Sequence, residues 1–237
     1  MKEREFAAKA QNNYDNFVTN EDLVQKLVSE KTLLTPRIID AFKAIDRKDF
    51  VLPEDQNMAY EDRPLPIGYG ATISQPTTVA IMLEKLFEKS GDPVRSKETL
   101  RALAASNGAS KILEIGTGSG YMTALLTKMI EKKGKVFSIE YVPELKGLAE
   151  FNLMKYGFRN IALFAGDGKI GLKAYGPFDK MISSASGKEI PKAWKEQLKA
   201  GGRIVAPLGD NLVILDKLSK RKFKEEKIPG FVFVPLQ

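Results

Sequence analysis

The 237-residue sequence contains no cysteine and no histidine. The lack of cysteine excludes disulfides and thiolate nucleophiles, and the two absences together exclude the usual cysteine and histidine zinc sites. Without histidine, the chain also cannot build a Ser-His-Asp triad or use an imidazole as a general base. Any chemistry must therefore depend on carboxylates, lysines, hydroxyls, oriented backbone groups or a bound cofactor.

Long apolar runs are absent as well. No run approaches the roughly 18 apolar residues that a membrane span needs, and no apolar segment follows the charged residues 1–5, so we expect no membrane partner and a cytoplasmic location. The net charge is +7, from 37 Lys+Arg against 30 Asp+Glu. That modest excess does not by itself indicate a nucleic-acid partner, and we do not expect one.

The first third of the chain predicts helices followed by an irregular segment. Two amphipathic helices are expected between residues 20 and 47, with a break at Thr35-Pro36. Residues 53–76 contain many prolines and glycines and predict a long loop, a candidate for a substrate-facing surface. We expect residues 1–76 to pack with a core of residues 77–237 as one compact unit.

The rest of the chain alternates helix-length segments with short apolar runs. This alternation predicts an α/β fold, a doubly wound seven-stranded sheet that is mostly parallel with an antiparallel C-terminal edge. The expected helices are 77–89 and 96–105. The expected strands are 111–115, 135–139, 161–164, 178–183 and 203–207, with an antiparallel pair at 212–215 and 231–234. The charged residues 217–227 between that pair predict a solvated connection.

A glycine-rich segment follows the first of these parallel strands. Gly116, Gly118 and Gly120 lie between strand 111–115 and the next helix, where backbone can approach a ligand at an electropositive helix N-terminus. The Gly-x-Gly-x-Gly spacing differs from the dinucleotide fingerprint Gly-x-Gly-x-x-Gly, and no Gly-Lys-Ser/Thr closes the loop. The segment therefore favours a cofactor loop of another kind.

Two carboxylates follow the next strands. Glu140 ends strand 135–139 and could accept hydrogen bonds from both ribose hydroxyls of an adenosine. Asp167, between two glycines after strand 161–164, could accept one from an adenine amino group. The plainer interpretation is that the glycines only make a turn and the acids cap helices.

With these features aligned, the sequence resembles class I S-adenosylmethionine-dependent methyltransferases, and within them the protein-L-isoaspartate (D-aspartate) O-methyltransferase family. The similarity covers roughly residues 21–236. It is carried by Tyr60-x-Asp62-x-Pro64-Leu65-Pro66-Ile67-Gly68, Thr72-Ile73-Ser74-Gln75-Pro76, Leu113-Glu114-Ile115-Gly116-Thr117-Gly118-Ser119-Gly120-Tyr121, Gly166-Asp167-Gly168 and Phe233-Val234-Pro235-Leu236. The segment at Thr72 and the terminal Phe-Val-Pro-Leu are the most specific of these.

The resemblance implies a cofactor, an acceptor and a set of site residues. The cofactor would be S-adenosylmethionine, leaving S-adenosylhomocysteine, and the acceptor the free carboxylate of L-isoaspartyl or D-aspartyl residues in damaged proteins, whose methylation initiates repair. No metal is implied. The implied cofactor-binding residues are Glu114, Gly116, Thr117, Gly118, Gly120, Glu140, Asp167 and Gly168. The implied substrate-binding residues are Ile67, Ala71, Ile73, Ser183 and Val234, and the implied catalytic residues are Ser74 and Thr72.

The residue inventory suits this reaction. A carboxylate with a pKa near 4 is already ionised at neutral pH, so transfer of a methyl group to it requires no general base. Catalysis then depends on positioning and on the exclusion of water. Ser74 is the hydroxyl expected to hold the acceptor carboxylate or the methionine end of the cofactor. The alternative for Ser74 and Thr72 is capping of a helix that begins near Pro76.

Three departures from the family pattern bear on the acceptor. Ala71 replaces a glutamine found in many bacterial members, and residues 183–186 replace the usual Thr-Ala-Ala-type stretch near the reaction centre. Residues 92–108 form an insertion between the expected helix 77–89 and the first strand. The oligomeric state, the natural protein substrates and the role of the insertion stay open at this point.

The sequence also bears on functions other than methylation of isoaspartyl residues. A nucleic-acid base methyltransferase would typically carry an Asn/Asp-Pro-Pro-Tyr/Phe segment after the fourth strand, and residues 178–186 contain none. A metal-dependent catechol-type enzyme would need clustered acids, which we cannot assemble from the strand ends. A methyltransferase dedicated to one peptide and a cofactor-binding module that recognises isoaspartyl groups without turnover stay open.

Overall fold

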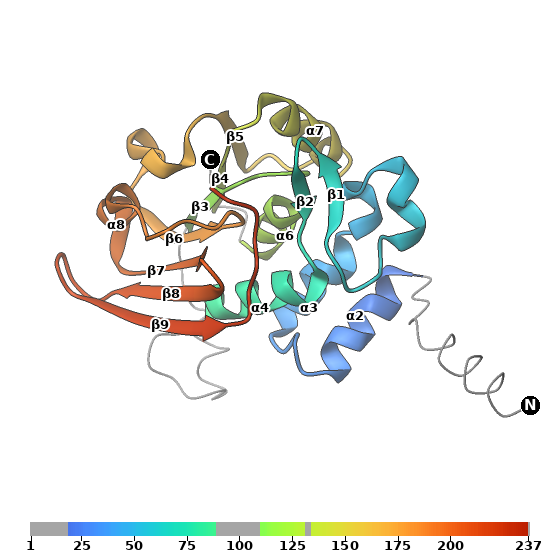
Figure 1. Ribbon diagram of the computed structural model, residues 1–237, viewed down its shortest axis with the longest axis horizontal. Helices are drawn as coiled ribbons and strands as arrows, with labels where there is room; N and C mark the ends of the chain where they lie inside the picture. Colours follow the sequence, from blue (N-terminus) through green and yellow to red (C-terminus); the bar gives the residue numbers. More distant parts are fainter. Residues whose placement is uncertain (1–18, 89–109, 131–133, 237) are drawn as a thin grey trace, which may run out of the picture.

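The computed structural model describes residues 19–88, 110–130 and 134–236. The predicted helix 96–105 and the insertion 92–108 lie outside these residues. One seven-stranded sheet with the order β5-β4-β3-β6-β7-β8-β9 crosses the molecule (Figure 1). Its strands are β3 (Lys111–Ile115), β4 (Lys135–Glu140), β5 (Ile161–Ala165), β6 (Phe178–Ser183), β7 (Leu198–Leu208), β8 (Asn211–Lys217) and β9 (Phe223–Pro229).

The first five of these strands are parallel, and β8 and β9 are antiparallel additions. A second sheet of two strands lies apart from it. The predicted α/β class, the parallel core and the antiparallel C-terminal edge are therefore confirmed. Strand residues alternate between the two faces of the large sheet, and each face is covered.

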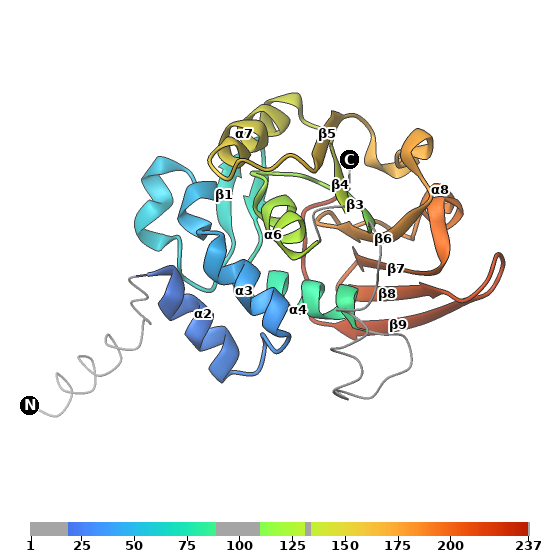
Figure 2. The same cartoon turned by 180° about the vertical axis from the view of Figure 1, so that it is seen from behind.

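One face of the sheet packs against most of the helices. Ile112, Val136 and Ile182 belong to the hydrophobic cluster on this face, which also includes side chains of α4 (Pro76–Phe87), α6 (Tyr121–Met129) and α7 (Pro143–Met154). The opposite face packs around Trp194 of the short α8 (Lys192–Gln197). Figure 2 shows α4 and α6 in front of the sheet. No helix in the described ranges is both long and apolar enough to cross a membrane.

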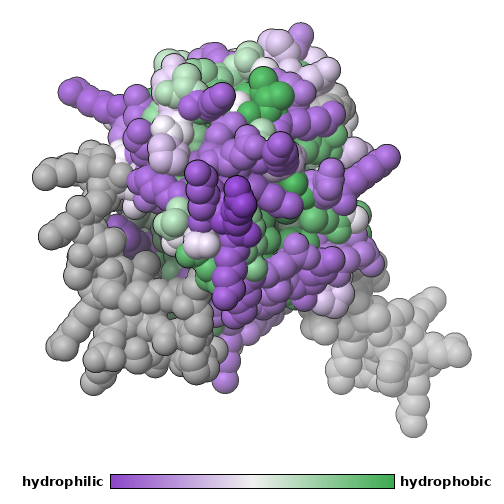
Figure 3. Space-filling model, turned by 90° about the vertical axis from the view of Figure 1, so that its left-hand side faces the viewer, coloured by the Kyte–Doolittle hydropathy of each residue, from purple (hydrophilic) through white to green (hydrophobic). Residues whose placement is uncertain are grey.

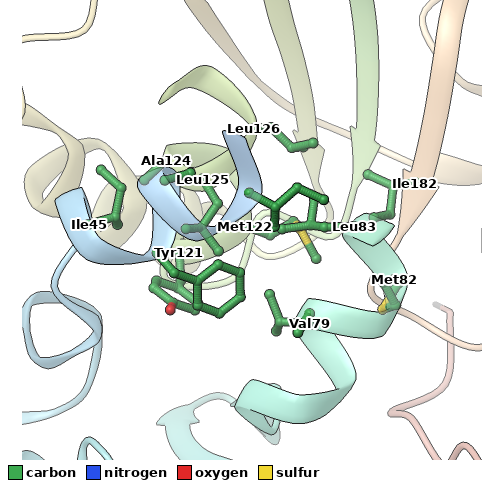
Figure 4. Packing of buried hydrophobic residues seen from close by; sticks show 14 of the residues in the cluster. Ile45, Val79, Met82, Leu83, Tyr121, Met122, Ala124, Leu125, Leu126 and Ile182 are labelled. Atoms are coloured by element: carbon green, nitrogen blue, oxygen red, sulfur yellow. The ribbon is translucent and has the colours of Figure 1, made fainter. Parts of the chain in front are cut away.

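The two N-terminal helices join the same cluster. They are α2 (Asn20–Ser29), capped by Thr19 and Asp22, and α3 (Pro36–Ala44), which has proline in its first turn. The predicted helix pair and its break are thus confirmed. Figure 4 shows Ile45, at the end of α3, beside side chains of α6. Glu84 of α4 accepts hydrogen bonds from the backbone N–H of Leu34 and Thr35, at 2.7 Å each.

The segment predicted as a loop over 53–76 contains regular structure. After the 3-10 helix η1 (Arg47–Phe50), the segment begins with a second 3-10 helix, η2 (Pro53–Met58), and it ends in a hairpin of β1 (Leu65–Gly68) and β2 (Ala71–Ile73). The hairpin turns at Tyr69, which adopts φ +54° between two glycines that also have positive φ. Pro64 directly before the strand β1 and Pro66 within it hid this strand in the sequence, since proline usually argues against a strand.

The predicted strand 231–234 is wrong, and the edge strand lies earlier. β9 falls within the charged residues 217–227 and a few beyond them, and its Lys224, Glu225, Glu226 and Lys227 are exposed. Charged side chains protect an edge strand from pairing with another chain, so such a strand does not read as apolar. The side of the molecule where the β8–β9 hairpin ends is largely hydrophilic (Figure 3).

Residues 231–236 instead run back across the molecule toward the ends of the parallel strands, as the red trace in Figure 1 shows. Two backbone hydrogen bonds hold them there. Ser186 N–H donates to the carbonyl of Val234, and Leu236 N–H donates to that of Ser186, both at 2.8 Å. This segment, residues 231–236, is called the C-terminal segment below.

A buried ion pair connects α4 to the sheet. Arg203 of β7 forms a two-pronged pair with Asp216 of β8, at 2.6 and 2.9 Å, and its Nη1 also donates to the carbonyls of Lys85 and Glu88 at the end of α4. Removal of one partner from a buried pair leaves the other charge uncompensated in a low-dielectric environment.

We therefore expect Arg203→Met to lower the free energy of unfolding by about 3–5 kcal/mol, measured by urea denaturation. The double variant Arg203→Met, Asp216→Leu should recover part of this loss. Lys192, whose pair with Glu196 is exposed, provides the control Lys192→Met, with an expected change under about 1 kcal/mol. An Arg203→Met protein as stable as the control would contradict the prediction.

Candidate active site

Hydrogen-bonded register brings three strand ends to one edge of the sheet. Ile115 of β3 lies opposite Ile139 of β4 and Ser183 of β6. The next residues along the three strands, Gly116, Glu140 and Ser184, therefore lie next to each other at the carboxyl edge. Open α/β sheets bind ligands at this edge, because the loops there diverge from a rigid platform.

A cavity opens at this edge, and we call it the strand-end cavity. Its lining comes from the β1–β2 hairpin, the ends of β3, β4 and β6, the start of α7 and the C-terminal segment. The lining residues are Tyr69, Gly70, Ala71, Thr72, Ile115, Gly116, Gly118, Ile139, Glu140, Tyr141, Val142, Leu145, Gly168, Ser184, Ala185, Val234, Pro235 and Leu236.

The glycine loop forms the floor of this cavity. Gly116, Gly118 and Gly120 have φ values of +85°, +55° and +91°, which L side chains rarely adopt. Gly116 and Gly118 line the cavity. Gly120 instead begins α6 and packs against α7, where an added Cβ would lie 3.2 Å from Leu153 Cγ. Gly120 therefore shapes the loop and does not line the cavity.

Glu140 holds the glycine loop and faces the cavity. One carboxylate oxygen accepts a hydrogen bond from Gly118 N–H at 2.9 Å, and the other accepts one from Val142 N–H at 3.0 Å. Glu140 is buried, and of the described residues that line the cavity it is the one with an acidic or basic side chain. A carboxylate has about four acceptor sites, so two stay available for a ligand.

A polar network lies beneath the loop and not in the cavity. Glu114 is fully buried and accepts a hydrogen bond from Thr123 Oγ1, and the hydroxyls of Thr117 and Ser138 are 2.6 Å apart. Burial raises the pKa of Glu114 to about 8, with the nearby charge of Glu140 acting in the same direction. At neutral pH Glu114 is therefore mostly protonated, and it supports the loop as a neutral group.

The loop after β5 enters the site through Gly168. Asp167 caps a short 3-10 helix by accepting a hydrogen bond from Lys169 N–H, and it is not among the lining residues. Gly168 does line the cavity, and a Cβ there would lie 2.5 Å from Ile115 Cγ2. The indole N–H of the buried Trp194 donates to the Gly168 carbonyl at 2.8 Å, which fixes this loop from the opposite face.

A second cavity, which we call the neighbouring cavity, shares a border with the first. It is lined by Pro64, Thr72, Ser74, Gln75, Thr78, Ser184, Val232, Phe233 and Val234. Thr72, Ser184 and Val234 line both cavities. A group bound in one cavity and a group bound in the other would meet beside these three residues.

Ser74 lines the neighbouring cavity and does not cap the helix that follows. The N-cap residue of α4 is Gln75, which makes no side-chain capping bond. The capping role belongs to Asp62, whose carboxylate accepts from both the N–H and the hydroxyl of Thr77, at 2.8 and 2.7 Å. The hydroxyl of Ser74 has no hydrogen-bond partner among the described residues, so it is free to bind a ligand.

The other residues expected at the substrate divide into lining and supporting groups. Ala71 and Val234 line the strand-end cavity. Ile67 and Ile73 belong to the hairpin strands, and their side chains are buried. The Cδ1 atom of Ile67 lies 3.2 Å from the position that a Cβ on Gly118 would occupy. Ser183 is fully buried and lines neither cavity.

Several lining residues escaped the sequence analysis. Tyr69 and Tyr141 line the strand-end cavity although both are largely exposed, and Ser184 lies at the border of the two cavities. Tyr141 could have been found, because it directly follows Glu140 at a strand end. Ser184 could also have been found, because it directly follows the predicted strand 178–183, whose end coincides with that of β6. Within the described residues, no group of three acidic side chains could hold a metal ion.

The sequence was compared with protein families and with known proteins. The profile of the protein-L-isoaspartate (D-aspartate) O-methyltransferase family matches residues 18–237. This chain belongs to that family. A protein-L-isoaspartate O-methyltransferase of Pyrobaculum islandicum is 41% identical over 219 residues, which cover 91% of this chain and 97% of the relative. Another from Fervidobacterium nodosum is 41% identical over 204 residues, covering 85% and 94%.

Solved structures of the family share the fold. A Plasmodium falciparum protein, assigned as a protein-L-isoaspartate O-methyltransferase and crystallised with S-adenosyl-L-homocysteine, superposes with a TM-score of 0.76 at 20% identity, covering 92% of this chain and 98% of that one. A second protein-L-isoaspartate O-methyltransferase gives a TM-score of 0.74 at 24% identity, covering 91% and 65%. At these identities the likeness establishes the architecture alone.

The raised pKa of Glu114 predicts a pH dependence of stability. Its folded-state pKa of about 8 exceeds the ordinary glutamate pKa of 4.5, so the folded state holds the proton more tightly. The resulting stabilisation is complete below about pH 4.5 and is lost as the pH rises through 8. Relative to Glu114→Gln, the free energy of unfolding of the wild type should therefore fall between pH 5 and 8.

Urea denaturation of both proteins at several pH values measures this difference. The absence of histidine removes the side chains that usually titrate in this range. An equal difference between the two proteins at pH 5 and pH 8 would show that Glu114 is not held protonated.

Proposed function

We propose that this chain transfers a methyl group from S-adenosylmethionine to the free carboxylate of L-isoaspartyl or D-aspartyl residues in peptides and damaged proteins, and so initiates their repair. The observation that carries the proposal is the meeting of two cavities at Thr72, Ser184 and Val234. A donor in the strand-end cavity and an acceptor in the neighbouring cavity would come into contact there. Family membership supports the identity of both molecules.

The residues of the strand-end cavity fit the cofactor. The open backbone of Gly116 and Gly118 admits a ligand at the N-terminus of α6. Glu140 keeps two acceptor sites for the ribose hydroxyls, while its bonds to Gly118 and Val142 hold it in place. Gly168 leaves room beside the strand ends. When bound, the cofactor supplies a methyl group activated by a sulfonium.

The electrostatics of the two cavities suit this reaction. A carboxylate and a sulfonium react to give a neutral ester and a neutral thioether, so charge disappears along the reaction path. A lysine or arginine beside the carboxylate would stabilise the reactants more than the transition state. Within the described ranges, no lysine or arginine lines either cavity. The described surroundings of the acceptor therefore consist of uncharged groups: hydroxyls, the amide of Gln75, backbone and apolar side chains.

The neighbouring cavity suits a peptide acceptor. The hairpin side supplies Pro64 and Ser74, and the C-terminal segment supplies Val232 and Phe233. Val232 is 90% exposed, so the cavity opens to solvent and can admit a segment of a larger chain. Ser74 has an uncommitted hydroxyl at this wall, and in the proposal it donates a hydrogen bond to the substrate. We propose the cytoplasm as the site of the reaction.

The role of Glu140 is tested by binding of S-adenosylhomocysteine. We expect Glu140→Gln to raise the Kd by about 10- to 100-fold, because a neutral amide weakens the charge-assisted bonds to ribose and presents a donor to Gly118. Calorimetry measures the Kd. Glu144 is exposed and lines neither cavity, so Glu144→Gln is the matched control. Equal affinity in Glu140→Gln and the control would contradict the assignment.

The acceptor is tested with a matched pair of peptides, one containing isoaspartate and the other aspartate. We expect labelled methyl to pass from S-adenosylmethionine to the isoaspartyl peptide alone. Ser74→Ala should lower kcat/KM by about 10-fold, as expected for the loss of one hydrogen bond to a charged group. Ser219→Ala, in the exposed turn between β8 and β9, serves as the control.

Failure to label either peptide, in a protein that binds S-adenosylhomocysteine, would overturn general repair activity. A methyltransferase for one dedicated peptide, or a recognition module without turnover, would then be the better explanation. Labelling of both peptides equally would show that the cavity does not distinguish the isoaspartyl linkage.

A further inference from the structure

Three serines lie at the end of β6: Ser183 is its last residue, and Ser184 and Ser186 follow it. The hydroxyls of two of them form hydrogen bonds within the protein. The hydroxyl of Ser183 donates to the carbonyl of Ala185 at 2.8 Å and accepts from its N–H at 3.2 Å. The hydroxyl of Ser186 donates to the carbonyl of Gly209 at 3.4 Å. The hydroxyl of Ser184 makes no hydrogen bond with any of the described residues. Among the three, Ser184 is therefore the one available to a ligand.

The backbone of Ser184 is nevertheless firmly placed. Its N–H donates to the carbonyl of Ile115 at 2.9 Å, which continues the parallel ladder of β3 and β6 by one step. Its Cβ lies 3.7 Å from the place that a Cβ on Gly116 would occupy. The side chain is thus attached to the rigid end of the sheet, beside the glycine loop, and the residue is half-buried.

Ser184 also lies where the two reactants must meet. It lines both the strand-end cavity and the neighbouring cavity, a property that it shares with Thr72 and Val234. In-line transfer requires the acceptor oxygen to lie within about 3–3.5 Å of the methyl carbon, so the acceptor carboxylate occupies the border between the cavities. Ser74 lines the neighbouring cavity alone.

We propose that Ser184 is a further catalytic residue, whose hydroxyl donates a hydrogen bond to the acceptor carboxylate and orients it toward the methyl group. The proposal rests on the methyl transfer proposed above. The acceptor carboxylate would then lie between Thr72 of the hairpin and Ser184 at the end of the sheet. The bond goes to the oxygen that does not attack, so the attacking oxygen keeps its lone pair for the new C–O bond while the C–S bond breaks.

A hydroxyl is well suited to this role. Its hydrogen bond restricts the direction of the carboxylate, whereas a full positive charge would also oppose the loss of negative charge on reaction. The substitution Ser184→Ala keeps the Cβ that packs beside Gly116 and removes the hydroxyl alone. We therefore expect the fold and the cofactor site to stay intact in this variant.

The test compares Ser184→Ala, Ser184→Thr and Ser186→Ala with the wild type. Two quantities are measured: kcat and KM for methylation of an isoaspartyl peptide, and the Kd for S-adenosylhomocysteine. Ser184→Ala should lower kcat/KM by about 10- to 100-fold, the range for one hydrogen bond to a charged group, with a Kd within about 2-fold of the wild type. Ser184→Thr keeps the hydroxyl and should retain most of the activity. Ser186→Ala, in the same turn but outside both cavities, should resemble the wild type.

Each other outcome overturns the proposal in a distinct way. Wild-type kcat/KM in Ser184→Ala, with an active wild-type enzyme, removes the role of Ser184 and leaves the proposed function standing. An equal loss in Ser184→Ala and Ser184→Thr, or a parallel loss of S-adenosylhomocysteine binding, assigns the residue to packing of the turn. A wild-type protein that methylates no isoaspartyl peptide overturns the proposed function together with this inference.

Discussion

The hydrogen-bonded register of the parallel strands is the constraint on which the site depends. Because Ile115, Ile139 and Ser183 are aligned across β3, β4 and β6, the residues after them reach one edge together. The glycine loop, the carboxylate of Glu140 and the hydroxyl of Ser184 therefore converge although they are far apart in sequence. A shift of the register by one residue would also move each side chain to the opposite face.

A second set of contacts holds the loops at the carboxyl edge of the sheet in place. The neutral Glu114 and its partner Thr123 lie beneath the glycine loop, and the indole of Trp194 reaches the loop after β5 from the opposite face. These residues line neither the strand-end cavity nor the neighbouring cavity. They hold the backbone segments that do line the strand-end cavity, and so support the site without contact with a ligand bound there.

How much could be predicted from the sequence depended on whether the signal was local. Parallel strands buried on both faces give continuous apolar runs, and closely spaced glycines mark a loop with positive φ, so the parallel strands and the glycine loop were found. The hairpin of β1 and β2 was missed because proline usually argues against a strand. The strand β9 was missed because the charged residues that protect an exposed edge gave it no apolar pattern. In both cases pairing with a neighbour decided the conformation.

By itself the sequence determined the fold class, the helix break at Pro36, the glycine loop and the kind of chemistry that a chain without histidine or cysteine can perform. These four features depend on hydrophobic periodicity, on the backbone preferences of glycine and proline, and on which side chains are present. All three can be read from residues that are close together in the sequence or from the composition. The tertiary structure alone decided that Asp62 caps α4, that Ser74 is thereby left uncommitted, and that Ser184 and not Ser183 reaches both cavities. Those assignments require the partner of each polar group to be known, and such partners are supplied by residues distant in the chain.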